Sequence, residues 1–209
     1  MSTLIYIGAN VGNSLSSFVD IYDSIHVFEP DPEMFDVLKD RFQSYSHVKL
    51  INAACSDKSG VTTFYVTPNR VSSSLGIVST LTHDEDHPQR KYQEIQVNTI
   101  NLLDYLKDNN IEHIDLYYSD AQGSDLNILK TISEYIEDKK IDELFIETHG
   151  NNKTLYDGLN NEFDGFKNLL IPNYHFVHAS LGRLDNAIVS EAEIPEDEYE
   201  WDSLWRVNV

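Results

Sequence analysis

The sequence predicts an α/β fold, a doubly wound sheet with helices on both of its faces. Short apolar runs of strand type alternate along the chain with segments of helical periodicity, which is typical of a mainly parallel sheet. Near the C-terminus, strand-like segments at 174–179 and 187–189 flank a turn at 181–183 and indicate an antiparallel hairpin at one edge. Without an internal repeat or a linker, the 209 residues predict a single domain, 1–209.

Five apolar or alternating runs in the first half of the chain predict strands. They are residues 4–7, 24–29, 48–54, 61–66 and 95–100. A glycine follows the first run, and Pro30 ends the second, because proline cannot continue a strand ladder. Serines within 14–17 are expected to cap a short helix, and apolar residues recur at helical spacing up to Phe42.

The second half repeats the alternation of strands and helices. Its buried strands are predicted at 114–120 and 144–149, and its helices at 102–106, 126–136 and about 153–170. The tail at 191–200 is acidic. Trp201 and Trp205 follow it and are expected to anchor the end of the chain by packing.

The charge of the chain excludes several classes of partner. It has 35 acidic and 15 basic side chains, a formal net charge of −20. A nucleic-acid binder needs a basic face, so we expect neither nucleic acid nor an anionic membrane as partner. No apolar run approaches the ~20 residues of a membrane helix, and no signal peptide precedes the first strand, so a cytoplasmic location is expected. The single cysteine, Cys55, fits a reducing compartment and is interpreted as buried filler.

Polar residues end several of the otherwise apolar strands. In a doubly wound sheet, ligands bind beyond the carboxyl ends of the strands. The sequence puts there the glycine turn at 8–12 and a series of polar residues, namely Glu29, Asn52, Asp57, Asp120, Glu147 and His149. Packing explains such repeated polar strand ends poorly, so they predict a functional site.

The glycine turn and Glu29 indicate a nucleoside ligand. Glu29 follows Gly8 by about 20 residues, the separation at which an acid grips a ribose. A dinucleotide and S-adenosylmethionine would both fit, but a pyrophosphate favours a fuller glycine motif than Gly-x-Asn-x-Gly. Asn10 and the acidic surface favour the sulfonium cofactor. We therefore predict S-adenosylmethionine, held by Gly8, Ala9, Asn10, Gly12, Glu29, Pro30, Asn52, Ala53, Asp57 and Asp120.

Taken together, the motifs resemble the FkbM family of S-adenosylmethionine-dependent methyltransferases. The resemblance spans roughly residues 4–150 and rests on the segments 7–12, 27–32, 52–60, 73–75, 120–130 and 145–147, which occur in family order. It implies a class I methyltransferase (Rossmann-like) fold with about seven strands, the last antiparallel. It also implies O-methylation of a hydroxyl on a small-molecule or glycan acceptor, typically a sugar or a natural product.

Two positions differ from the family pattern, and a third shows a milder change. Tyr6 stands where an acid is usual, and Tyr118 stands where lysine is usual, while Asp125 replaces a glutamate. These differences leave open a nucleotide-binding module or a degenerate methyltransferase without turnover. An NAD-dependent oxidoreductase is the enzymatic alternative.

Asp120 is the first candidate for the base that removes the acceptor proton, because it ends a strand where the methyl group should lie. His149 is the second, since histidine titrates near neutral pH, and its alternative role is that of a hydrogen-bonded strand-end residue. Asp120, Glu147 and His149 could instead hold Mg²⁺ or Mn²⁺, but a site without metal is favoured.

A long polar loop is predicted over 68–90. Its cluster from His83 to His87 resembles a metal site in composition only, because adjacent residues rarely point at one centre. We interpret the cluster as solvated and the segment 72–90 as a substrate lid.

Overall fold

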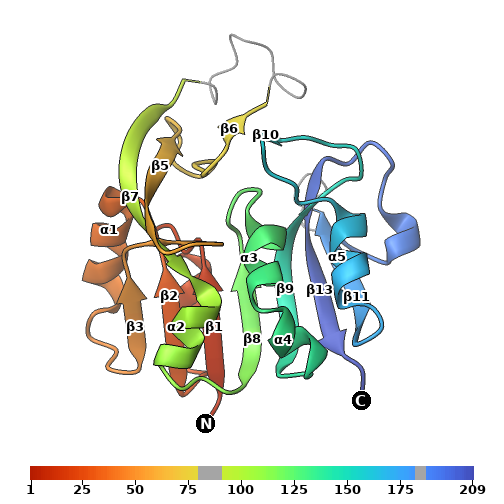
Figure 1. Cartoon of the computed structure of the whole chain (residues 1–209), viewed down its shortest axis with the longest axis horizontal. Coiled ribbons are helices and arrows are strands. Elements are labelled where there is room, and N and C mark those ends of the chain that lie inside the picture. Colours follow the sequence, from red (N-terminus) through yellow and green to blue (C-terminus); the bar gives the residue numbers. More distant parts are fainter. Residues whose placement is uncertain (80–90, 182–186) are drawn as a thin grey trace.

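An eight-stranded mixed sheet forms the centre of the computed structural model, which describes residues 1–79, 91–181 and 187–209. The strand order is β12-β11-β13-β9-β8-β1-β2-β3 (Figure 1). Its parallel strands are β1 (Thr3–Ile7), β2 (Ser24–Phe28), β3 (Val48–Ile51), β8 (Ile114–Ser119) and β9 (Ile141–His149). The antiparallel pairs near the C-terminus involve β11 (Tyr174–Leu181), β12 (Ala187–Val189) and β13 (Glu200–Val207).

This sheet confirms the predicted α/β fold, including the antiparallel hairpin of β11 and β12 at one edge. The sequence prediction lacks β13, which lies between β9 and β11 and follows a short 3-10 helix, η4 (Glu191–Glu193). In β13 the residues Trp201, Ser203 and Trp205 are buried, and the residues between them are not. This period of two is that of a strand with one buried face.

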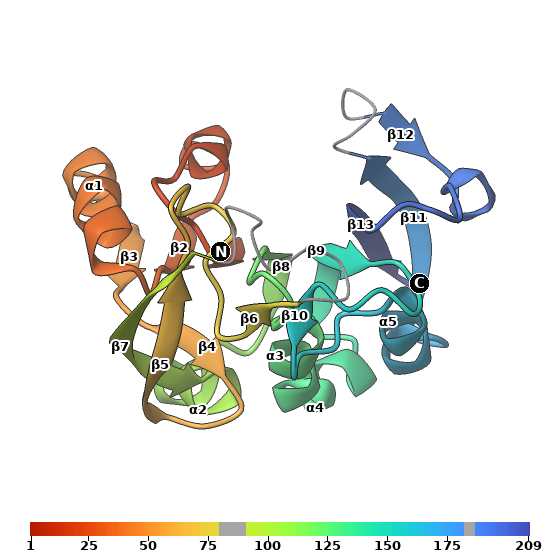
Figure 2. The ribbon, with the colours of Figure 1, turned by 90° about the horizontal axis from the view of Figure 1, so that it is seen from above.

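Helices cover the two faces of the sheet unequally. One face carries α2 (Leu102–Asp108), α3 (Asp125–Thr131), α4 (Ser133–Glu137) and α5 (Phe163–Leu170), which share a core cluster with Ile5 of β1. The other face carries η1 (Ser14–Ser17) and α1 (Pro32–Phe42), whose cluster includes Leu4 of the same strand. Figure 2 shows the two layers from above, on opposite sides of the sheet.

Two smaller sheets lie beyond the carboxyl ends of the parallel strands (Figure 1). One has the order β4-β7-β5 and consists of β4 (Ala54–Ser56), β5 (Gly60–Val66) and β7 (Gln93–Asn101); the other pairs β6 (Ile77–Val78) with β10 (Tyr156–Asp157). Because β6 falls within 68–90, the prediction of an uninterrupted loop there is wrong. The cluster from His83 to His87, and with it much of the predicted lid, lies outside the described residues.

The structure corrects three helical predictions. The helix expected over 126–136 divides into α3 and α4, because Ile132 leaves helical geometry at φ −108° and ψ 28°. The region expected at about 153–170 is helical only in α5, and β10 precedes it. The expected serine cap is also wrong, since Asn13 takes the N-cap position of η1 and makes no side-chain capping hydrogen bond.

Three predicted core residues are buried as expected. Cys55 is a free thiol with 2% of its surface exposed, and Trp201 and Trp205 pack in the core with Phe163 of α5. Within the described ranges, every helix is too short or too polar to cross a membrane.

His26 gives the fold a testable dependence on pH. Its ring lies between β2 and α2, with Nδ1 2.8 Å from the Tyr105 hydroxyl and Nε2 3.1 Å from the Ser24 hydroxyl. Burial lowers the pKa of His26 from 6.5 to about 4. Between these values the unfolded state binds the proton and the folded state does not, so stability is lost as the pH falls from 6.5 towards 4.

We expect the free energy of unfolding to fall by about 1 kcal/mol more in the wild type than in His26→Gln between about pH 7.5 and about pH 5.5. Urea unfolding at both pH values measures this difference. His175→Gln, on the exposed surface of β11, is the matched control and should follow the wild type. An equal loss in the wild type and in His26→Gln would show that another group causes it.

Candidate cofactor and active site

A cavity opens at the carboxyl ends of β1, β2 and β8, where the sequence predicts the ligand site. It encloses about 630 Å³ when the open solvent at its mouth is included. Its lining combines apolar and polar residues. Among the lining residues are Ile7, Gly8, Phe28, Glu29, Phe64 and Asp120.

The glycine turn ties the ends of three strands together. The backbone N–H groups of Gly8 and Ala9 both donate to the carbonyl oxygen of Phe28, at 3.0 and 3.2 Å. Gly8 has φ +75°, and a Cβ at this position would collide with the carbonyl oxygen of Asp120. Glycine is therefore required both by the backbone conformation and by the close approach of β8.

Glu29 joins the glycine turn to the start of α1. Its Oε2 accepts from the backbone N–H of Asn10 at 2.7 Å, and its Oε1 accepts from that of Asp31 at 2.8 Å. Burial raises the pKa of Glu29 to about 7. Each carboxylate oxygen has a second lone pair, so Glu29 can still accept hydrogen bonds from a ligand.

A segment of residues 67–75, here called the strap, borders the same cavity. In Arg70 of the strap, Nη1 donates to both carboxylate oxygens of Asp31, at 2.9 and 2.7 Å, and Nη2 pairs with Glu33 at 2.7 Å. The side chain of Asn10 donates to the carbonyl oxygen of Arg70 at 3.1 Å. Arg70 cannot be predicted from the sequence, because a single basic residue in a polar loop carries no signal of its distant partners.

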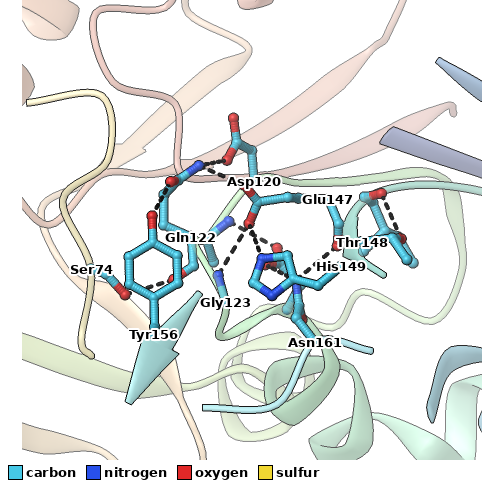
Figure 3. A network of polar contacts seen from close by, with 12 residues as sticks. Ser74, Asp120, Gln122, Gly123, Glu147, Thr148, His149, Tyr156 and Asn161 are labelled. Atoms are coloured by element: carbon cyan, nitrogen blue, oxygen red, sulfur yellow. Dashed lines mark hydrogen bonds and ion pairs between the residues drawn. The ribbon is translucent and has the colours of Figure 1, made fainter. Parts of the chain in front are cut away.

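Carboxylates from two strand ends meet around Gln122 (Figure 3). Gln122 Nε2 donates to Asp120 Oδ1 at 2.6 Å and to Glu147 Oε1 at 2.7 Å. The hydroxyl of Tyr156 donates to the side-chain oxygen of Gln122. Gln122 thus uses its whole amide to hold two acids and a tyrosine together. The strand-end pattern of the sequence points only to Asp120 and Glu147.

A second network supports the first from inside the fold. Asp125 is fully buried and accepts from the Ser119 hydroxyl, from the Ala121 N–H at 2.8 Å and from Asn161 Nδ2 at 3.0 Å. Asn161 also donates to the carbonyl oxygen of Glu147 at 2.9 Å. Asn161 lies in a segment that the sequence predicts to be helical, so its contacts with the site could not be predicted.

His149 lies at the end of β9 beside this network. Its ring is 2% exposed, and its Nε2 is 3.7 Å from Glu147 Oε2. Burial lowers the pKa of His149 to about 4, so the imidazole is neutral at pH 7. Among the described residues, Nε2 finds no hydrogen-bond partner.

Burial and mutual repulsion raise the pKa values of several acids in this region. Desolvation, followed by the charges of neighbouring acids, raises the pKa of Asp120 to about 7 and that of Asp202 to about 6. The same causes raise the pKa of Glu147 well above its usual range. Perturbed acids that gather at one edge of a sheet are typical of functional sites.

The predicted cofactor residues divide into two groups. Those that line the cavity are Gly8, Asn10, Glu29, Pro30, Ala53 and Asp120, whereas Ala9, Gly12, Asn52 and Asp57 are not among its described lining residues. Gly12 packs against α1, where a Cβ would meet the side chains of Leu38 and Phe42. Asn52 donates to the carbonyl oxygen of Glu29 at 2.8 Å, and Asp57 borders a neighbouring groove.

The two tyrosines that depart from the family pattern contact each other. Tyr6 and Tyr118 are paired in register across β1 and β8, and their rings stack with centroids 4.4 Å and planes 9° apart. Neither is among the described residues that line the cavity. The opposite charges usual at these two positions are therefore replaced jointly, by an aromatic pair outside the cavity.

The fold and the cavity together define an α/β chain of the class I methyltransferase type, with a mixed sheet and a ligand site at the carboxyl ends of its parallel strands. Residues 7–176 match the model of the Methyltransferase FkbM domain. The chain therefore belongs to the FkbM methyltransferase family, as the motifs of the sequence predict.

Solved structures support the fold. The FkbM methyltransferase of Methylobacillus flagellatus KT has a TM-score of 0.58 and 12% identity, over 98% of this chain and 43% of that one, so this chain spans less than half of its length. An rRNA methylase from Streptococcus thermophilus has a TM-score of 0.52 and 9% identity, over 100% of this chain and 87% of that one. A putative methyltransferase from Streptococcus mutans in complex with SAH has a TM-score of 0.50 and 10% identity, over 100% of this chain and 89% of that one. A comparison with curated proteins finds no match.

Proposed function

We propose that this chain is an S-adenosylmethionine-dependent O-methyltransferase that acts on a hydroxyl of a sugar, a glycan or a small natural product. The observation that carries the proposal is the cavity in which the glycine turn, Glu29 of the β2 end and Asp120 of the β8 end meet. Membership of the FkbM family supports methyl transfer.

The residues of the cavity fit this cofactor. Gly8 keeps the turn free of a side chain, so that a ligand can approach the backbone. Glu29 offers a carboxylate to the ribose hydroxyls, and Phe28 and Phe64 offer apolar surface to an adenine ring. Asn10 replaces the glycine that a pyrophosphate would favour, and this supports a cofactor without phosphate.

When bound, S-adenosylmethionine supplies an electrophilic methyl group on a positively charged sulfur. Asp120 would take the proton of the acceptor hydroxyl as that oxygen receives the methyl group that the cofactor would supply. A pKa of about 7 suits Asp120 to this role at neutral pH. Gln122 fixes Asp120 Oδ1 by a hydrogen bond of 2.6 Å, which leaves Oδ2 to receive the proton. His149 is the alternative base, and its low pKa makes it the weaker one.

The charge around Asp120 supports an uncharged or cationic acceptor. The charges of Glu200 and Asp202 raise the pKa of Asp120, and the charges of Asp120 and Glu200 raise that of Glu147. The whole chain has a net charge of −20. A polyanionic acceptor would be repelled from such an edge. We therefore propose a small-molecule or glycan acceptor and not a nucleic acid, and the likeness to an rRNA methylase is a likeness of fold.

Isothermal titration with S-adenosylhomocysteine and with NAD tests the cofactor. We expect S-adenosylhomocysteine to bind at least about 100-fold more tightly than NAD, a difference of about 2.7 kcal/mol. Tighter binding of NAD would support the oxidoreductase alternative and end the proposal.

Transfer of tritium from S-[methyl-³H]adenosylmethionine tests the reaction. A panel of sugars, glycans and small hydroxylated natural products serves as acceptors, and each labelled acceptor is matched with its deoxy analogue. We expect label in the hydroxylated compound and none in the analogue. Cofactor binding without transfer to any acceptor would favour the alternative of a degenerate methyltransferase.

A further inference from the structure

The ends of β9 and β13 present four polar side chains on one face of the sheet. Glu147 and His149 are two residues apart on β9 and so point to the same side. In the antiparallel register, Glu200 lies opposite His149 and Asp202 lies opposite Glu147. Like charges directly opposite each other destabilise a strand pair, and a bound cation would remove this cost.

One buried nitrogen in this group lacks a partner. His149 is 98% buried (2% exposed), yet its Nε2 makes no hydrogen bond, and Glu147 Oε2 lies 3.7 Å away, beyond hydrogen-bond length. Leaving a buried polar atom without a hydrogen-bond partner destabilises the fold. An imidazole nitrogen without a hydrogen-bond partner is available as a metal ligand.

We propose that Glu147, His149 and Glu200 bind a divalent transition-metal cation such as Mn²⁺. One ligand atom of each residue lies within 4.8 Å of the other two. Ligand atoms about 2.1 Å from a common ion are at most about 4.2 Å apart, so shifts of less than about 1 Å would complete the site. Two carboxylates and one imidazole favour Mn²⁺ or Zn²⁺ over Ca²⁺, which takes oxygen ligands.

Hydrogen bonds from neighbouring groups hold the carboxylate of Glu147 in place (Figure 3). Glu147 accepts from Gln122 Nε2 at 2.7 Å through one oxygen and from the Gly123 N–H at 3.1 Å through the other. Each oxygen keeps a second lone pair for a cation. Outer hydrogen bonds of this kind orient the ligands in known metal sites.

A second group of the same composition provides an internal comparison. His113, Asp115 and Asp142 also bring three ligand atoms within 4.8 Å, at the opposite end of the sheet. There the His113 side chain is 49% exposed, and its Nε2 already lies 3.2 Å from Asp142. This second group therefore lacks the unsatisfied buried nitrogen and does not carry a metal proposal.

This metal site differs from the metal-free site that the sequence favours, because Glu200 reaches the group only through the unpredicted strand β13. It is also independent of methyl transfer, since cation binding is measured without cofactor or acceptor. Failure of the metal proposal and failure of the proposed function are thus separate results.

Titration with MnCl₂ of protein stripped by EDTA tests the site, with free Mn²⁺ followed by electron paramagnetic resonance. We expect one bound Mn²⁺ per chain, and about tenfold or greater weakening in both Glu200→Gln and His149→Gln. Pulsed resonance of the bound ion should show a nitrogen coupling that His149→Gln removes. Glu200 is exposed, so its substitution leaves the core intact, and circular dichroism verifies the fold of each variant.

Asp142→Asn, in the second group, is the matched control and should bind Mn²⁺ as the wild type does. The proposal is overturned by wild-type protein that binds no Mn²⁺. It is also overturned by weak binding of many ions that is equal in all variants, or by binding that Asp142→Asn abolishes and Glu200→Gln leaves intact.

Discussion

Gly8→Ala is expected to destabilise the fold and to abolish binding of S-adenosylhomocysteine. Gly8 has φ +75°, and a Cβ there would collide with the carbonyl oxygen of Asp120, a backbone atom that a rotamer change cannot move. We expect a loss of about 3 kcal/mol in the free energy of unfolding, about 1 from the left-handed backbone and about 2 from the forced separation of β1 and β8. Because the same separation distorts the glycine turn that lines the cavity, the affinity should fall by about 100-fold or more.

Gly158→Ala separates the two causes. Gly158 has φ +79°, much as Gly8 has, but no atom lies within 4 Å of its added Cβ. It should therefore lose only about 1 kcal/mol and retain the affinity for S-adenosylhomocysteine. Urea unfolding and calorimetric titration of both variants measure the effects. Equal stability of Gly8→Ala and Gly158→Ala would mean that the strand ends can separate without cost, and the role given to Gly8 would be wrong.

The sequence predicts those parts of the fold that depend on local patterns. Apolar runs identify the five parallel strands, since burial on both faces makes a strand apolar throughout. The strand β13 is missed because Trp201 and Trp205 follow an acidic tail without an apolar run, and only the partner strand β9, far away in sequence, makes this segment a strand. The helical reading of 153–170 fails for a similar reason, because β10 forms only by pairing with β6.

The candidate site shows the same division. Gly8, Glu29 and Asp120 end strands and can be located from the order of elements alone, and all three line the cavity. Arg70 and Asn161 cannot, because their meaning lies in contacts with Asp31 and Asp125 across the fold. Side chains that hold a site together leave weaker patterns in a sequence than those that end its strands, since their partners are set by tertiary structure.

Only the structure explains why Tyr6 and Tyr118 stand together where the family pattern has charged side chains. In sequence the two residues are unrelated differences from the family, whereas in the sheet they are one cross-strand pair. Since neither lines the cavity, their substitution is compatible with an intact cofactor site. The alternative of a degenerate enzyme therefore depends on measured turnover and not on these tyrosines.

Asp120→Asn is expected to lower the rate of methyl transfer by about 100- to 10,000-fold, the usual contribution of a general base. Asparagine has the same shape and can accept the hydrogen bond that Gln122 Nε2 gives to Asp120 Oδ1. It cannot take a proton from a hydroxyl. The variant should also fold at least as well as the wild type, because it removes an acid whose pKa burial and neighbouring acids have raised to about 7.

The same variant should bind S-adenosylhomocysteine with nearly wild-type affinity, so the loss falls on kcat and not on cofactor binding. Asp115→Asn is the matched control: Asp115 lies on the same strand at its opposite end, where it accepts from the Thr3 N–H at 2.7 Å. It should leave the rate unchanged. If Asp120→Asn retained the rate, the proton would leave by another route, with His149 as the next group to test. If it lost cofactor affinity in parallel with rate, Asp120 would bind the cofactor and another group would act as the base.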